Sequence, residues 1–310
     1  MAVTSTPSRR GLGFVLGASI TVASGCATIE RHSARAEVEA IADQVYFGGS
    51  DNPKHRLDLF FPRNRPGFPV AVFIHGGYWR AGDRNYYSSL TGLYGSIGLS
   101  LAKRGIGVAV MSYRLAPEVT IERELEDVAR AVRFTLDASR LHGGDATRIV
   151  LTGHSAGGHL AMLLAFDDRW LRAAGVDPSL VAGVVALSPV VDIADMHDRN
   201  DAAFNADITD RVFGLDRSRF APFSPKTHIH AGEAPALLLL GGHDYPYLVA
   251  QVRLAVEQIH ELAAPVELEE IPGYTHEDMV RKVGDRDDAI TPRVAAFIER
   301  VEGTRQVGTP

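Results

Sequence analysis

Gly153-His154-Ser155-Ala156-Gly157-Gly158 is the stretch that decides the fold expected for this chain. It follows the apolar run Arg148–Thr152 and precedes the helix-forming run Leu160–Ala165. Gly-x-Ser-x-Gly between a strand and a helix predicts a strained turn that exposes the serine hydroxyl, because small flanking residues let strand and helix pass closely. The turn also places Ser155 at a helix N-terminus, where free N–H groups favour a nearby negative oxygen. Ser155 is therefore the candidate nucleophile.

A second glycine-bearing turn follows an earlier buried strand. The run Val70–Ile74 is followed by His75, Gly76 and Gly77. Two glycines directly after a strand let the backbone approach a ligand and leave N–H groups free to face a developing oxyanion. We expect Gly76 and Gly77 to form this oxyanion hole with the N–H of Ala156. His75 is expected to brace the loop by hydrogen bonds rather than to react.

Two aromatic residues continue the same loop. Tyr78 and Trp79 follow the glycines directly. They are expected to bind substrate by lining the pocket, where they would favour a small acyl group or an aromatic leaving group. The alternative is that both belong to the core.

The candidate acid and base follow later strands in chain order. The run Ala236–Leu240 leads to Asp244, and the run Val266–Ile271 leads to His276. A carboxylate at the end of a buried strand is suited to orient an imidazole and to stabilise its charged form. His276 is the only histidine after the last predicted strand. The order Ser155, Asp244, His276 predicts a catalytic triad.

Buried strands alternate with helices along the chain, which predicts an α/β fold with a mostly parallel central sheet and helices on both faces. An edge hairpin, expected to be antiparallel, precedes this pattern, with strands at Val45–Gly48 and His55–Phe61 and a charged helix or linker at Glu30–Asp43. The remaining strands are expected at Val70–Ile74, Gly107–Met111, Arg148–Thr152, Gly183–Leu187, Ala236–Leu240 and Val266–Ile271. The clearest helices are expected at Glu122–Leu141, Pro246–Leu262 and Pro292–Val301, from apolar residues at helical spacing.

One connection, residues 189–233, is too long for a simple loop. Insertions of this length beside a catalytic face are often lids or substrate pockets, and a structural excursion is the equal alternative. A helix is expected near Asp207–Val212. Asp192 and Asp195 in this insertion are weaker candidates for the triad acid.

The N-terminal residues have the pattern of an exported bacterial protein. Arg9-Arg10 precedes a weakly apolar stretch too short to span a membrane, and Ala23-Ser24-Gly25-Cys26 resembles a lipobox. We expect residues 1–25 to be an export signal of the lipoprotein type, in a Sec or twin-arginine version. Cys26 would then be lipidated, and a lipid anchor would be the only membrane contact; the alternative is a disordered tail with an incidental cysteine. Residues 26–44 would link the anchor to a catalytic domain at 45–301, followed by a tail at 302–310.

Composition limits the classes of partner. The net charge of −6 and the absence of basic blocks argue against nucleic acid, whose binding needs clustered Lys and Arg. The sequence has neither a phosphate-loop pattern nor a zinc-ligand pattern, and its single cysteine excludes an internal disulfide. We therefore expect a small-molecule substrate and no cofactor or metal.

These motifs together resemble the α/β-hydrolase carboxylesterases, over roughly Val45–Val301. His-Gly-Gly-Tyr-Trp is also similar to the motif of kynurenine formamidases. Tyr86–Leu90, Ser112-Tyr113-Arg114, the Gly-His-Ser-Ala-Gly-Gly stretch and Thr275-His276 resemble isoprenylcysteine methylesterases and their bacterial relatives. The resemblance implies Ser155 as nucleophile, His276 as base and Asp244 as acid.

The function expected from these features is hydrolysis of short-chain or aryl carboxylic esters through an acyl-enzyme. Arylformamidase activity is the first alternative, because ester and amide hydrolysis share this machinery. A non-catalytic, cholinesterase-like binding protein is an alternative of another class, which the presence of every triad member disfavours.

Overall fold

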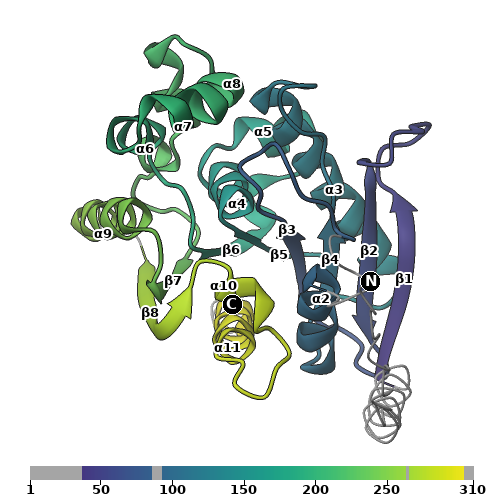
Figure 1. Cartoon of the computed structure of the whole chain (residues 1–310). Coiled ribbons are helices and arrows are strands. Elements are labelled where there is room, and N and C mark those ends of the chain that lie inside the picture. The colour runs from purple at the N-terminus through teal and green to yellow at the C-terminus, as the bar shows by residue number, and fades with distance from the viewer. Residues whose placement is uncertain (1–36, 86–92, 263–264, 304–310) are drawn as a thin grey trace, which may run out of the picture.

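An eight-stranded sheet forms the centre of the protein, in the order β1-β2-β4-β3-β5-β6-β7-β8 (Figure 1). The computed structural model describes residues 37–85, 93–262 and 265–303. Strands β3 to β8 run parallel, while β2 is antiparallel to both β1 and β4. The parallel strands are β3 (Val70–Ile74), β4 (Gly107–Met111), β5 (Ile149–His154), β6 (Val181–Leu187), β7 (Ala236–His243) and β8 (Val266–Thr275). The predicted sheet is confirmed.

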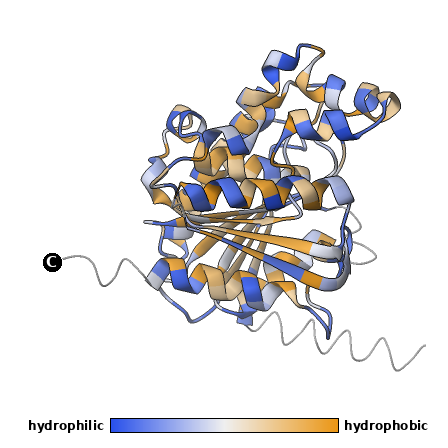
Figure 2. Cartoon of the chain, turned by 90° about the vertical axis from the view of Figure 1, so that its left-hand side faces the viewer, coloured by the Kyte–Doolittle hydropathy of each residue, from blue (hydrophilic) through white to orange (hydrophobic). Residues whose placement is uncertain are grey.

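Both faces of this sheet are buried, which explains its continuous apolar runs. In β3, Val70, Val72 and Ile74 belong to one core cluster, while Ala71 and Phe73 belong to a second. Successive side chains of a strand point to opposite faces, so one strand supplies both clusters. Figure 2 shows the mostly hydrophobic strands between two layers of helices.

Helices on each face cover one of these clusters. On the first face lie α3 (Ile121–Leu141), α4 (Ala156–Phe166), α5 (Arg169–Ala173) and α9 (Pro246–Glu261). On the second lie α2 (Leu93–Lys103), α10 (Asp278–Arg281) and α11 (Ile290–Gly303). All eleven residues of α4 are buried. A helix that is apolar on every side belongs in the interior, and α4 carries the Ser155 turn there.

The edge hairpin is present, but its first strand lies earlier than expected. Strand β1 is Val38–Val45 and pairs with β2 (Arg56–Pro62), so the expected strand at Val45–Gly48 and the expected linker up to residue 44 are wrong. Only Val38 of this strand is buried, and its other residues are half-buried or exposed at the sheet edge, where the charged Glu39 and Asp43 discourage pairing with other chains. The charged residues of this strand are also typical of a linker, which is what the sequence pattern predicted. The folded domain therefore includes residues from Val38 onward.

The long insertion folds into short helices: α6 (Ile193–Arg199), α7 (Ala202–Asp207), α8 (Thr209–Phe213) and the 3₁₀ turns η2 (Arg217–Arg219), η3 (Ala221–Phe223) and η4 (Pro225–His228). The helix expected near residue 207 corresponds to α8. Phe213, Phe220 and Phe223 of this segment are buried in the main core. The insertion therefore packs onto the domain, and its opening as a lid stays a prediction.

Cys26 and residues 1–25, the expected export signal, lie outside the described residues. Within those described, no helix combines the length and apolarity needed to cross a bilayer.

Candidate active site

Ser155 occupies a strained turn between β5 and α4. Its backbone has φ 54° and ψ −120°, a region that residues other than glycine rarely adopt. The Ser155 N–H donates to the Leu187 carbonyl at 2.8 Å, which ties the turn to β6. A Cβ atom at Gly153 would lie 2.4 Å from the Gly157 carbonyl carbon, and one at Gly157 would lie 2.1 Å from the Ile74 oxygen. The flanking glycines are required because strand, turn and helix touch here.

Gly76 brings the loop after β3 against this turn. A Cβ atom at Gly76 would lie 3.2 Å from Ser155 Cβ and 3.0 Å from the His154 oxygen. Gly77 has φ 114°, in the region that favours glycine. No described group accepts a hydrogen bond from the N–H of Gly77 or Ala156. Both amides are therefore available to stabilise negative charge beside Ser155.

His75 braces this loop. Its ring is fully buried, its Nδ1 lies 2.8 Å from the Gly76 oxygen, and it stacks on Tyr113 at 4.4 Å. The Tyr113 hydroxyl donates to the His75 carbonyl at 3.0 Å. Burial lowers the pKa of His75 to about 4, so it stays neutral near pH 7.

Asp244 and His276 meet at the ends of β7 and β8. His276 Nδ1 lies 2.9 Å from Asp244 Oδ1, and the pair is buried. Asp244 also accepts from the Tyr245 N–H at 2.7 Å and from the Ser188 hydroxyl. Burial alone would raise the pKa of Asp244, but its hydrogen bonds, from His276 above all, hold the pKa below its ordinary value. The carboxylate therefore stays charged and fixes the imidazole.

Ser155 is linked to His276 indirectly, through a hydrogen bond of the last residue of β5. The preceding residue, His154, has its Nε2 2.9 Å from the His276 carbonyl oxygen. The described contacts include no hydrogen bond from the Ser155 hydroxyl to His276. Such bonds are often long before substrate binds and tighten during reaction.

Asp192 and Asp195 lie elsewhere. Asp192 caps α6 by accepting from the N–H groups of Ala194 and Asp195, and it pairs with Lys226. Asp195 pairs with Arg199 at 2.7 Å. Both carboxylates are engaged within the insertion, and of the three candidate acids Asp244 is the one that contacts His276.

The two aromatic residues after the glycines have different positions. Trp79 has no exposed surface, and its Nε1–H donates to His159 Nδ1 at 3.1 Å. The structure therefore places Trp79 in the core, and its predicted role in binding substrate is wrong. Tyr78 is half-buried, with its ring 5.8 Å from that of Phe204 in the insertion. It is the residue of this pair that has surface to offer a substrate.

Sequence reasoning missed three supporting residues: Ser188, His154 and His159. The hydroxyl of Ser188 reaches Asp244 across 56 positions of sequence. His154 and His159 flank the Ser155 turn on strand and helix. Their place within or beside the Gly-x-Ser-x-Gly stretch was the available signal.

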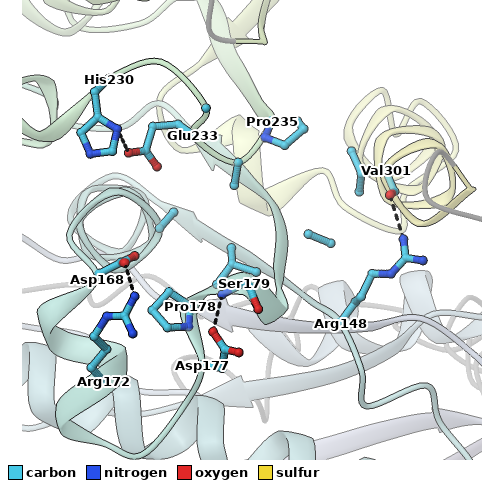
Figure 3. A pocket seen from close by; sticks show the side chains of 15 residues that line it. Arg148, Asp168, Arg172, Asp177, Pro178, Ser179, His230, Glu233, Pro235 and Val301 are labelled. Atoms are coloured by element: carbon cyan, nitrogen blue, oxygen red, sulfur yellow. Dashed lines mark hydrogen bonds and ion pairs between the residues drawn. The ribbon is translucent and has the colours of Figure 1, made fainter. Parts of the chain in front are cut away.

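A cavity of about 490 Å³ lies at the amino ends of the parallel strands, opposite the candidate triad (Figure 3). Its lining includes Arg148, Val181 and Pro235, which lie at or just before the amino ends of β5, β6 and β7. The candidate triad lies at the carboxyl ends, the edge where open α/β sheets place their ligands. This cavity is therefore separate from the chemistry. No group of His, Cys, Asp or Glu in the described part of the chain could hold a metal ion.

The family model BD-FAE matches residues 57–258. The chain belongs to this family of α/β-hydrolase esterases. The match begins in β2 and includes Ser155 and Asp244, while His276 lies beyond it.

Known relatives of this BD-FAE member are esterases and a formamidase. It is 29% identical to isoprenylcysteine alpha-carbonyl methylesterase ICME of Arabidopsis thaliana, over 74% of this chain and 55% of the relative. It is 23% identical to kynurenine formamidase of Drosophila melanogaster, over 79% and 77%. The chain thus spans little more than half the length of the plant relative.

A solved structure shares the fold. Esterase B from Lactobacillus rhamnosis superposes with a TM-score of 0.73 at 22% identity, covering 91% of this chain and 94% of that one. At this identity the likeness shows the fold alone.

Proposed function

We propose that the protein is a serine carboxylesterase that hydrolyses short-chain or aryl carboxylic esters through an acyl-enzyme. The observation that carries the proposal is the buried His276–Asp244 pair, 2.9 Å apart. This pair lies at the carboxyl ends of the parallel strands, as does the strained Ser155 turn. Gly76 lies against Ser155 and completes the arrangement.

In the proposed mechanism His276 is the general base. Its Nδ1 is bound to Asp244, so Nε2 remains to take the proton from the Ser155 hydroxyl. The serine oxygen attacks the ester carbonyl, and the N–H groups of Gly77 and Ala156, together with that of Gly76 or Tyr78, stabilise the oxyanion. His276 then protonates the leaving alcohol. Water repeats the cycle and releases the acid and Ser155.

The preference for small or aryl groups rests on the aromatic residues at this edge. Tyr78 comes from the loop after β3, Phe204 from α7 and Tyr247 from α9. The Phe204 ring lies 5.8 Å from that of Tyr78 and 6.5 Å from that of Tyr247. Aromatic faces contribute to binding a flat substrate group by offset or edge-to-face contact.

Arylformamidase activity is the second candidate, and the kynurenine formamidase relative favours it. A series of p-nitrophenyl esters of increasing acyl length, run beside N-formyl-kynurenine, separates the two. We expect the short esters to have the higher kcat/KM. A much higher kcat/KM for the formamide would replace the ester proposal.

A fluorophosphonate probe tests whether Ser155 reacts at all. We expect labelling of the wild type and none of Ser155→Ala. The matched control is Ser179→Ala, an exposed serine at the opposite edge, which should label like the wild type. Persistent labelling of Ser155→Ala would assign the nucleophile elsewhere, and an unlabelled, inactive wild type would favour the non-catalytic binding protein.

We also propose that the protein is exported and anchored by a lipid on Cys26. The support is the leader pattern, with the chain's single cysteine directly after Ser24-Gly25. Cys26→Ser should move the protein from the membrane fraction to the soluble fraction of the producing bacterium. An unchanged distribution would reject lipidation.

A further inference from the structure

The His276 imidazole contacts two other aromatic rings besides the Asp244 carboxylate. The His154 ring centroid lies 4.5 Å from it, and the Tyr245 ring centroid lies 4.7 Å from it. His154 directly precedes Ser155, and Tyr245 directly follows Asp244. Each of the other two candidate triad residues thus has a sequence neighbour that packs on the base.

His154 is held in one uncharged form. The His276 carbonyl can only accept, so His154 Nε2 carries the proton and donates at 2.9 Å. Burial above all, together with the neighbouring His276, lowers the pKa of His154 to about 3. His154 therefore adds no second positive charge when His276 becomes protonated, and it fixes the main chain of His276 to the strand that carries Ser155.

Tyr245 is fixed by two hydrogen bonds. Its N–H donates to Asp244 Oδ1 at 2.7 Å, and its hydroxyl donates to Glu277 Oε1 at 3.0 Å. Its side chain also lies against Tyr247, with the rings 6.0 Å apart and nearly parallel. Burial raises the pKa of Tyr245, so the ring stays a neutral phenol.

The face of such a ring attracts a cation within about 6 Å of its centroid. During turnover the imidazolium form of His276 arises when the base takes the serine proton, so an attraction to that form lowers the barrier rather than strengthening substrate binding. The titratable groups described in contact with the His276 ring are Asp244, His154 and Tyr245, and Tyr78, Tyr247 and the exposed Glu277 lie beside Tyr245. Of the three groups in contact with His276, Asp244 is kept ionised by its hydrogen bonds, while His154 and Tyr245 are neutral near pH 7.

We propose that His154 and Tyr245 are positioning residues of the esterase reaction. His154 holds the main chain of His276, and the Tyr245 ring stabilises the imidazolium that forms during acyl transfer. This inference rests on the proposed function, in which His276 is the base.

The test compares Tyr245→Phe, which keeps the ring, with Tyr245→Leu, which removes it, on p-nitrophenyl acetate across pH. We expect Tyr245→Leu to lower kcat about fivefold, with KM changed less than twofold. The acid limb of its kcat/KM profile should move to lower pH, because the protonated base loses a stabilising contact. Tyr245→Phe should retain most of the wild-type kcat and the wild-type acid limb.

Three results would overturn the inference. Tyr245→Leu with the kcat and acid limb of the wild type would show that the ring has no effect on the base. An equal loss in Tyr245→Phe would assign the effect to the Glu277 hydrogen bond, and a change in KM alone would assign Tyr245 to substrate contact. A wild type that hydrolyses no ester would overturn the proposed function itself, and is thereby distinguished from the other three.

His154 is tested by His154→Gln, whose amide can still donate to the His276 carbonyl, and by His154→Leu, which cannot. We expect kcat to fall at least tenfold in His154→Leu and to recover in part in His154→Gln, with both variants folded by circular dichroism. Equal activity in the two variants would show that the hydrogen bond does not position His276.

Discussion

At the residue scale, the acid of the candidate triad is held by a hydrogen bond from a serine that belongs to no recognisable sequence motif. Ser188 follows β6 with φ 48°, is fully buried, and donates its hydroxyl to Asp244 Oδ2. His276 occupies Oδ1 of the same carboxylate. Ser188 and His276 therefore hold the two different oxygens of the Asp244 carboxylate. The hydrogen bond from Ser188 also helps to keep this carboxylate ionised.

We predict that Ser188→Ala lowers kcat about tenfold. A hydrogen bond to a charged group contributes about 1.5–3 kcal/mol, and tenfold corresponds to about 1.4 kcal/mol. Steady-state hydrolysis of p-nitrophenyl acetate measures the effect. Ser139→Ala is the matched control, because Ser139 is equally buried in α3 and its hydroxyl has no described partner. A variant as active as this control would remove Ser188 from the site.

At the scale of elements, a buried histidine joins three segments that the sequence places far apart. His159 on α4 accepts from Trp79 Nε1–H in the loop after β3, and its Nε2–H donates to the Phe223 carbonyl at 2.7 Å in the insertion. Burial lowers the pKa of His159 to about 3, so this neutral arrangement persists across the working pH range. The insertion is thereby connected to the loop that carries Gly76 and Gly77.

We predict that His159→Leu lowers the free energy of unfolding by about 3 kcal/mol and lowers kcat. The substitution leaves the Trp79 N–H and the Phe223 carbonyl buried without partners, at a cost of about 1–3 kcal/mol each. Urea denaturation measures the loss. Combining it with Trp79→Phe should cost less than the sum of the single changes. Additive losses would mean that the two side chains are not coupled.

The end of α11 carries a buried carboxyl group that destabilises the fold when it is ionised. Glu302 lies in its last turn, has a buried Oε1 without a described partner, and lies 3.9 Å from Arg148 through Oε2. Burial raises the pKa of Glu302 to about 7. A carboxyl with a raised pKa favours the folded state most below its unfolded pKa of 4.5, and that contribution is lost as the pH rises towards 7.

We predict that Glu302→Gln raises the free energy of unfolding at pH 8 by about 1 kcal/mol, a value reduced for the solvent that still reaches this side chain. At pH 4 the variant should match the wild type, because the glutamate is then protonated in both states. Glu299→Gln, at an exposed position of the same helix, is the control. A gain that is equal at the two pH values would contradict the ionisation argument.

At the scale of the whole molecule, local pattern predicted the elements, and tertiary packing decided the exceptions. Apolar runs placed β3 to β8, and the order of Ser155, Asp244 and His276 predicted that strand ends would gather them at one edge. Trp79 could not be assigned from local sequence, because its burial depends on His159, 80 positions away. The same holds for Ser188, whose partner is set by the neighbouring strand β7.

The edge strand shows the remaining limit. Charged residues are typical both of linkers and of strands exposed at a sheet edge, so local composition cannot separate the two. The pairing of Val38 with Pro62 and of Ile41 with Leu59 settles β1 as part of the sheet. The start of the folded domain is therefore open to direct measurement.

We predict that a chain beginning at Glu37 keeps kcat/KM within about twofold of the full-length protein, while one beginning at Tyr46 aggregates. The longer chain retains all of β1, including Val38, which is 3% exposed. The shorter chain loses β1 and leaves β2, with its apolar Leu57, Leu59 and Phe61, as an unprotected edge, which favours pairing between molecules. Size-exclusion chromatography and ester hydrolysis measure both outcomes. A monomeric, active chain beginning at Tyr46 would show that β1 is dispensable and would restore the domain start expected near residue 45.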